Sequence, residues 1–160
     1  MSLAYKTAIA RTTASAPTKW LAREHRLLGS ILDYGCGRGK DVEWLKEAGK
    51  MVVGYDPFYF SKSTITPDPW WIANSFDTVI CNFVLNVIES YADRLKVLND
   101  LIRVVRPQGR IYVSIRADKA KLNGLTKIGT WQGYVPLEAP WKLLHKTSSY
   151  ELYEFIKETE

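Results

Sequence analysis

The chain has 160 residues, of which 46% are hydrophobic and 24% charged, a composition typical of a soluble globular domain and not of a disordered, collagenous or coiled-coil chain. No apolar run approaches the ~18 residues of a membrane-spanning helix, and two cysteines without an export signal favour the cytoplasm. The net charge of +5 fits a nucleic-acid partner as well as a small-molecule substrate.

The first half of the chain predicts two helices and two strands after a mobile arm of residues 1–14. They are, in order, a helix over residues 15–28, a strand over 30–34, a helix over 40–48 and a strand over 50–55. Ser15 is a typical N-cap, Pro17 is tolerated in a first helical turn, and Gly29 is a typical C-terminal glycine.

The second half predicts a strand over residues 76–83, a helix from 90 that stops at Pro107, a strand over 110–116, and a hairpin of 142–147 and 150–156. Capping-box spacing marks the start of this helix, and an apolar stripe predicts its buried face: Tyr91, Leu95, Leu98, Ile102 and Val105. Alternating strands and helices predict an α/β, Rossmann-like fold with a mostly parallel, doubly wound sheet and a C-terminal antiparallel hairpin. At this length we expect residues 1–160 to form one minimal domain that lacks a separate substrate domain.

The most informative stretch is the glycine-rich loop after the first strand, DYGCGRG at residues 33–39. Its spacing fits neither the ATPase phosphate loop, G-x-x-x-x-G-K-[ST], nor the dinucleotide loop, G-x-G-x-x-G. Asp33 would repel phosphates but attract an ammonium or sulfonium group, and Asp56, after the next strand, is placed to hydrogen-bond a ribose diol. The two acids match S-adenosylmethionine better than NAD. The alternative is that Asp33 caps a turn and Asp56 precedes a proline bend.

Four stretches between about Ser30 and Arg116 have the order and spacing of one known family: ILDYGCGRGKDVEWL, VVGYDPFY, FDTVICNFVLNVI and LIRVVRPQGRIYVSIR. Through them the chain resembles the class I S-adenosylmethionine-dependent methyltransferases. It departs from their usual R-x-L-x-P-G-G stretch at Gln108, which stands where the first glycine usually does. The chain also shows a narrower resemblance, to the small methyltransferase-like proteins encoded beside bacterial DNA-phosphorothioation genes and in phages. This resemblance includes the stretches TAIARTTASAPTKWL and GTWQGYV.

The resemblance assigns cofactor-binding roles to Asp33, Gly35, Cys36, Gly37, Asp56, Pro57, Phe58, Asn74 and Asn82. In these roles Asp56 would hold the ribose hydroxyls, Asn74 would replace the family's acidic contact to the adenine amine, and Asn82 would face the transferable methyl group. The family's habit also implies that N-terminal residues fold over the cofactor as a lid: Arg11, Ser15 and Lys19.

Methyl transfer from a sulfonium needs little acid–base chemistry, because the leaving thioether takes up no proton. Holding nucleophile and methyl group in near-attack geometry can contribute about 7–11 kcal/mol. The candidate catalytic residues are Asn82 and, with Arg116 on the acceptor side, Asp118. The third strand is not followed by N/D-P-P-Y/F and no Pro-Cys nucleophile occurs, which disfavours the usual adenine-N6, cytosine-N4 and cytosine-C5 transfers. Histidines and cysteines lack metal-ligand spacing, so no metal is expected.

Two functions remain open at this point. The first is an active methyltransferase whose acceptor is a nucleic acid or nucleotide, and the second is a cofactor-binding module that is inactive alone and serves a larger assembly. Basic residues gather in 1–30 and 103–127, and would bind phosphates if both stretches shared a face; a solvated surface is the alternative. Residues 129–134 either close over the acceptor or form a turn with packed aromatics. No membrane partner is expected, and the oligomeric state is left open.

Overall fold

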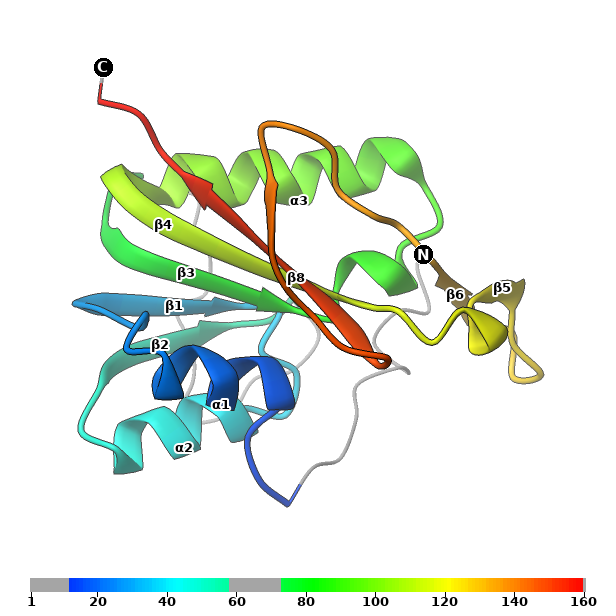
Figure 1. Cartoon of the computed structure of the whole chain (residues 1–160), viewed down its shortest axis with the longest axis horizontal. Coiled ribbons are helices and arrows are strands. Elements are labelled where there is room, and N and C mark those ends of the chain that lie inside the picture. The colour runs from blue at the N-terminus through cyan, green and yellow to red at the C-terminus, as the bar shows by residue number, and fades with distance from the viewer. Residues whose placement is uncertain (1–11, 58–72, 160) are drawn as a thin grey trace.

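The computed structural model describes residues 12–57 and 73–159 of the chain. Its centre is a six-stranded sheet with the strand order β2-β1-β3-β4-β8-β7 (Figure 1). The strands are β1 (Ser30–Tyr34), β2 (Met51–Tyr55), β3 (Phe76–Asn82), β4 (Val105–Arg116), β7 (Lys142–Lys146) and β8 (Tyr150–Ile156). The first four run parallel, and β8 runs antiparallel to both β4 and β7. The predicted α/β fold with its C-terminal antiparallel hairpin is confirmed.

Helices cover both faces of the sheet. Helices α1 (Ala16–Arg23) and α2 (Lys40–Glu47) lie on one face and α3 (Tyr91–Val104) lies on the other (Figure 1). Side chains alternate along each strand, so Ile31 and Ile80 pack in the α1/α2 core while Leu32 and Val79 pack in the α3 core. The same alternation places the side chain of Asn82 on the α1/α2 face.

Helix α1 is shorter than the predicted range of residues 15–28. It ends at Arg23, and the chain turns at His25, whose φ is 55°. The turn forms because Leu27 enters the α1/α2 core, where a continuing helix would not have placed it. Gly29, with φ of 64°, is therefore not the helix's C-terminal glycine; it allows the entry into β1, where a Cβ atom would lie 2.1 Å from Asp77 Oδ2.

Helix α3 begins as predicted, with Ser90 as its N-cap, whose Oγ accepts a hydrogen bond from the backbone N–H of Asp93 at 3.3 Å. Its predicted buried stripe is only partly correct. Val105 is buried, but Tyr91 is 68% exposed and Leu95 is 40% exposed. The first turns of α3 carry apolar side chains that the rest of the described structure does not cover.

The connection from β4 to β7 explains why these turns stay open. It contains the 3₁₀ helix η4 (Lys119–Lys121), the small hairpin of β5 (Asn123–Leu125) and β6 (Trp131–Gly133), and an extended segment, but no α-helix. Another 3₁₀ helix, η3 (Leu85–Val87), links β3 to α3. In Figure 1 the β5–β6 hairpin projects beyond the end of the sheet. Within residues 12–57 and 73–159, no helix has the length and apolar character needed to cross a lipid bilayer.

Candidate active site

The carboxyl ends of three parallel strands bring most of the predicted site residues to one edge of the sheet. Asp33 of β1 is level with Gly54 of β2 and with Ile80 of β3. Asp56 lies two residues beyond Gly54, and Asn82 lies two residues beyond Ile80, so both follow Asp33 at this edge. Their shared position agrees with the rule that ligands of doubly wound sheets bind at the carboxyl ends of the strands. Their individual roles stay predictions.

The glycine-rich loop is fixed by backbone hydrogen bonds to the end of β2. The N–H groups of Gly35 and Cys36 both donate to the carbonyl oxygen of Tyr55, at 2.7 and 2.9 Å. The N–H of Gly37 donates to Asp56 Oδ2 at 2.8 Å. Asp56 therefore connects the two strand ends that the sequence singled out.

Gly35 allows the loop to pass close to the segment after β3. Its φ is 76°, a conformation that glycine adopts readily, and a Cβ atom here would lie 2.4 Å from Val84 Cγ2. A side chain at this position would therefore push the loop away from the segment after β3.

The two thiols near this edge have raised pKa values. Burial raises the pKa of the Cys36 thiol, and the carboxylates of Asp33 and Asp56 raise it further. Burial also raises the pKa of Cys81, which lies in the α3 core. Both thiols stay protonated near neutral pH, so neither is activated as a nucleophile.

The donors and acceptors at this edge fit S-adenosylmethionine. Two almost fully buried carboxylates lie at the carboxyl ends of adjacent strands, Asp33 within β1 and Asp56 directly after β2, and a Cβ atom at Gly35 in the loop after β1 would clash. Carboxylates accept hydrogen bonds from an ammonium group and from ribose hydroxyls, whereas they repel a pyrophosphate. Pro57 follows Asp56 and is exposed, and Phe58 lies outside the described residues.

Asn82 belongs to a buried polar network. Its Nδ2 donates to Thr18 Oγ1 at 2.9 Å and to Asp41 Oδ2 at 3.1 Å, and its Oδ1 accepts from Ser114 Oγ at 2.8 Å. Asp41 also accepts from the backbone N–H of Ser15 at 2.6 Å and from its Oγ at 2.7 Å. The network joins β3, β4, α1 and α2, and engages the Asn82 amide at both ends.

Asp41, the centre of this network, was not singled out from the sequence. It is 6% exposed and lies in the first turn of α2, where an acid is ordinary because of the helix dipole. Its partners lie 23 to 41 residues away, so no local pattern marks it. The predicted cap Ser15 uses its hydroxyl for Asp41 and makes no side-chain cap on α1. Ala14, the last residue of the predicted mobile arm, is packed and buried, and Arg11 lies outside the described residues.

Asp118 lies just beyond the carboxyl end of β4 and is paired with Arg116. Arg116 Nε donates to Asp118 Oδ1 at 3.1 Å, and a second guanidinium nitrogen donates to Oδ2. Buried Asn86 of η3 accepts from the backbone N–H of Arg116 at 3.4 Å and donates to Gln132 Oε1 of β6 at 3.0 Å. Asn86 therefore ties residues 129–134 to the sheet, a role that the sequence did not indicate. A catalytic role of Asp118 stays a prediction.

Asn74 does not lie with the other predicted cofactor residues, and this prediction is wrong. It precedes β3, and its N–H donates to the carbonyl of Arg103 at the C-terminal end of α3, while its Oδ1 accepts from Lys157 Nζ at 2.8 Å. Asn74 is in a turn, with φ of 57°, and the strand from Phe76 to Ile80, which is level with Asp33, rises about 13 Å. Asn74 therefore lies at the amino edge of the sheet, whereas Asp33 and Asp56 lie at its carboxyl edge.

Among the described residues, the two basic stretches meet at Glu154, and the second stretch divides between the two ends of β4. Ion pairs engage several arginines of the two basic stretches: Arg26 and Arg110 with Glu154, Arg103 with Asp100, Arg106 with Asp77, and Arg116 with Asp118. Lys119, Lys121 and Lys127 lie beyond the carboxyl end of β4, whereas Arg103 and Arg106 lie at its other end. The exposed lysines at the carboxyl end of β4 are therefore separate from the arginines at its amino end.

Comparisons with known proteins show the family and the fold of the chain. A profile of the family described as "Methyltransferase domain" matches residues 5–150. No curated protein sequence matches the chain.

Three solved structures share the fold at low identity. The 1,6-didemethyltoxoflavin-N1-methyltransferase of Burkholderia thailandensis, solved with 1,6-didemethyltoxoflavin and S-adenosylhomocysteine, is 15% identical, with TM-score 0.66 over 99% of this chain and 80% of that one. The N-methyltransferase NodS of Bradyrhizobium japonicum, in complex with S-adenosylhomocysteine, is 13% identical, with TM-score 0.61 over 96% of each chain. The magnesium protoporphyrin IX methyltransferase of Synechocystis, with bound S-adenosylmethionine, is 19% identical, with TM-score 0.57 over 89% of this chain and 76% of that one. The chain therefore belongs to the methyltransferase domain family and has the fold of the class I S-adenosylmethionine-dependent methyltransferases.

Proposed function

We propose that this methyltransferase holds S-adenosylmethionine at the carboxyl ends of β1 and β2 and transfers a methyl group by direct in-line displacement. The observation that carries the proposal is the Gly37 N–H to Asp56 hydrogen bond, which fixes a glycine-rich loop between two buried carboxylates at adjacent strand ends. The cofactor supplies an electrophilic methyl group on a positively charged sulfur. Asp33 accepts from the ammonium group and Asp56 from the ribose hydroxyls.

Positioning is the main contribution of these residues. The Asn82 amide is neither an acid nor a base near neutral pH and is held by hydrogen bonds at both ends, and the Cys36 thiol stays protonated. Neither side chain is suited to act as a general base. This fits a displacement in which the leaving thioether needs no proton and orientation lowers the barrier.

The proposed acceptor is a nucleotide or a nucleic acid, approached from the end of the sheet that carries η4 and the β5–β6 hairpin. Lys119, Lys121 and Lys127 are exposed there, and Lys119 Nζ lies 4.6 Å from the centre of the Tyr134 ring. Exposed cations beside an aromatic ring are the features that contact phosphates and stack on bases.

Calorimetric titration with S-adenosylmethionine, S-adenosylhomocysteine and NADH tests the cofactor site. We expect one-site binding of both sulfur cofactors and no binding of NADH. Asp56→Asn retains an oxygen for the Gly37 N–H but removes the charge, and should weaken binding about tenfold or more. Asp77→Asn is the matched control, because Asp77 also accepts a backbone N–H, from Ser30 at 2.9 Å, but lies at the opposite edge of the sheet. Equal losses in both variants would refute the site.

Transfer of label from tritiated cofactor to DNA, RNA, protein extract or metabolite pools identifies the acceptor class. Label in nucleic acid, with oligonucleotide binding that weakens as salt rises, supports the proposed acceptor. Label in a nucleotide of the metabolite pool also supports it, whereas label only in protein or in small molecules other than nucleotides would exclude it. The second candidate, a cofactor-binding module inactive alone, is favoured by the protein contacts that occupy both ends of the Asn82 amide. Cofactor binding without transfer to any pool would establish it.

A further inference from the structure

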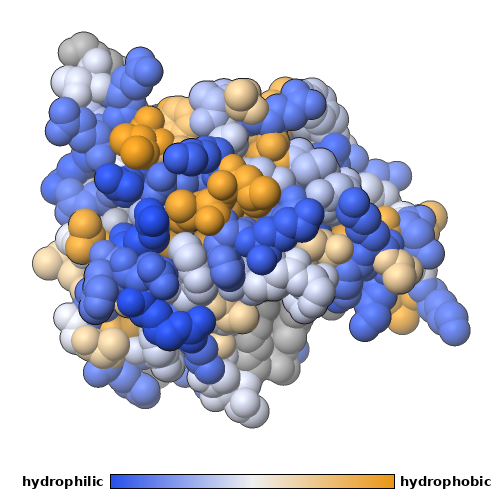
Figure 2. Space-filling model, viewed as in Figure 1, coloured by the Kyte–Doolittle hydropathy of each residue, from blue (hydrophilic) through white to orange (hydrophobic). Residues whose placement is uncertain are grey.

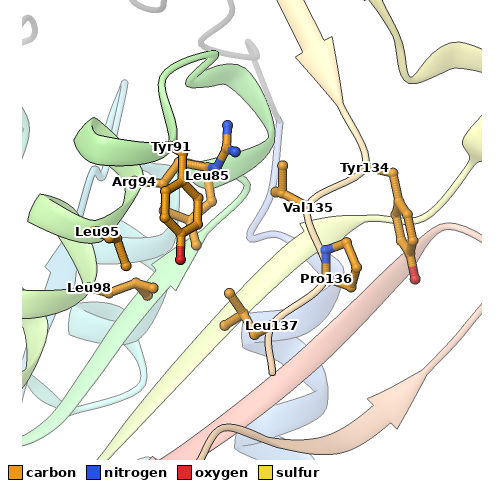
Figure 3. A pocket seen from close by; sticks show the side chains of 9 residues that line it. All are labelled: Leu85, Tyr91, Arg94, Leu95, Leu98, Tyr134, Val135, Pro136 and Leu137. Carbon is orange, nitrogen blue, oxygen red and sulfur yellow. The ribbon is translucent and has the colours of Figure 1, made fainter. Parts of the chain in front are cut away.

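An apolar groove runs between α3 and the extended segment that precedes β7 (Figure 3). It encloses about 260 Å³. Figure 3 shows the α3 side chains Leu95 and Leu98 on one side and Val135 and Leu137 on the other, with Tyr91 and Arg94 at one end. The groove lies on the α3 face of the sheet, whereas Asn82 and its network lie on the α1/α2 face.

The groove exists because an extended segment stands where a doubly wound fold would usually place a second helix. A helix is about 10 Å across and would cover the neighbouring face of α3, whereas extended chain is thinner and leaves a gap. Tyr91 and Leu95 remain exposed in consequence, at 68% and 40%. Both side chains line the groove, and concave apolar sites of this kind are candidates for binding a ligand.

The wall formed by the extended segment is fixed in place. The Tyr134 hydroxyl lies within hydrogen-bond distance of both carboxylate oxygens of Glu151, at 2.9 and 2.6 Å, and the Tyr153 hydroxyl donates to Glu151 Oε1 at 2.7 Å. Glu151 is almost fully buried on β8. Figure 3 shows the Tyr134 ring on the far side of the segment from α3. The groove is therefore preformed and needs no rearrangement to accept a ligand.

Arg94 places a positive charge at the end of this apolar groove. Its guanidinium donates to the backbone carbonyls of Ile88 and Glu89 and lies 5.8 Å from the Tyr91 ring and 5.6 Å from the Trp131 ring. Among the described residues it forms no ion pair with a carboxylate. Its charge is balanced only by neutral dipoles and aromatic faces, which leaves it available to an anionic group.

We propose that this groove binds a small apolar acid, with its hydrocarbon or ring system against Leu95, Leu98 and Leu137 and its carboxylate at Arg94. An apolar protein cavity of about 150 Å³ accommodates benzene, so 260 Å³ suits a body of about ten carbon atoms. The site is separate from the proposed cofactor site, and its occupation does not depend on methyl transfer.

Titration of the full chain, without added cofactor, with 2-naphthoate and with the neutral 2-naphthamide tests the proposal. We expect 2-naphthoate to bind at least about tenfold more tightly than 2-naphthamide, because only the carboxylate gains a charge-assisted contact with Arg94. Leu95→Glu introduces a negative charge into the groove at an exposed position, and should weaken 2-naphthoate binding tenfold or more. Leu143→Glu is the matched control, since Leu143 of β7 is similarly exposed, at 45%, and does not line the groove.

Arg94→Gln supplies an independent test and should bring the affinity for 2-naphthoate down to that for 2-naphthamide. Equal affinities of the wild-type chain for the two probes, or equal losses in Leu95→Glu and Leu143→Glu, would overturn the proposal. So would a wild-type chain that binds neither probe at about 5 mM, well above the range in which fragments of this size bind. If, in addition, the chain is a dimer that Leu95→Glu dissociates, the groove is a contact between copies and not a ligand site.

Discussion

Replacement of Asp41 by alanine tests whether the buried network at the end of β3 stabilises the fold. Asp41 accepts three hydrogen bonds from α1, from Ser15 N, Ser15 Oγ and Thr18 Oγ1, at 2.6, 2.7 and 2.9 Å. A fourth comes from Asn82 Nδ2 at 3.1 Å. A hydrogen bond to a charged group contributes about 1.5–3 kcal/mol, but bonds that share one acceptor are not additive. We expect Asp41→Ala to lower the free energy of unfolding by about 3 kcal/mol.

Urea denaturation followed by circular dichroism measures this change, and Asp93→Ala is the matched control. Asp93 also lies in the first turn of a helix, α3, but is exposed, so its replacement removes only a helix-dipole interaction of about 0.3–1 kcal/mol. Thr18→Val in the wild-type and Asp41→Ala backgrounds gives a double-mutant cycle with an expected coupling of about 1 kcal/mol. If Asp41→Ala costs no more than Asp93→Ala and the coupling is zero, the network does not stabilise the protein.

Three other changes have directions set by the structure. Gly35→Ala should destabilise the fold by about 1–2 kcal/mol, because φ is 76° and the new Cβ atom would clash with Val84. Adding Val84→Ala should recover part of this loss. If the losses of the two single variants simply add in the double variant, the clash is not the cause. Gln108→Gly should raise the free energy of unfolding by about 0.5 kcal/mol in thermal unfolding. A φ of 67° strains a residue with a Cβ atom by more than the extra backbone entropy that glycine loses on folding. A decrease in stability would show that the contacts of the Gln108 side chain outweigh this strain. The hydrogen bond to Glu151 raises the pKa of Tyr134 to about 12. In the unfolded chain the tyrosine hydroxyl has a pKa near 10, so the stabilisation by this hydrogen bond is present below pH 10 and is lost as pH rises toward 12. The difference in stability between wild type and Tyr134→Phe should therefore narrow between pH 10 and 12. A difference in urea unfolding that stays constant over this range would exclude the linkage.

The sheet and its functional edge were accessible to sequence reasoning because their signals are local. SILDY and FDTVICN are apolar runs long enough for buried strands, and both form strands in the structure. Asp33 lies next to the last residue of SILDY, and Asp56 directly follows the run MVVGY. Parallel strands bring their carboxyl ends together, so the common edge of the two acids followed from topology alone. The same rule, applied to Asn74, would have rejected it, because Asn74 precedes its strand and lies at the opposite edge.

The contacts that were not predicted depend on which elements meet in three dimensions. The Asp41 partners come from α1 and β3, and nothing in the residues around Asp41 separates it from an ordinary acid in a first helical turn. Tyr91 and Leu95 continue a correct helical stripe, but whether that stripe is covered depends on the conformation of residues 117–141. Periodicity identifies a face of a helix and does not identify what packs on it.

The position of β8 between β4 and β7 has a consequence for biosynthesis. β4 ends at Arg116, and its antiparallel partner begins only at Tyr150, so ribosomes complete the buried middle of the sheet well after they complete β4. Until then one edge of β4, along Ile111, Val113 and Ile115, has no hydrogen-bonded partner strand. Arg26 and Arg110 also lack their partner Glu154 during this interval. An open apolar strand edge recruits other chains, so this interval is the one in which a nascent chain most needs protection from aggregation.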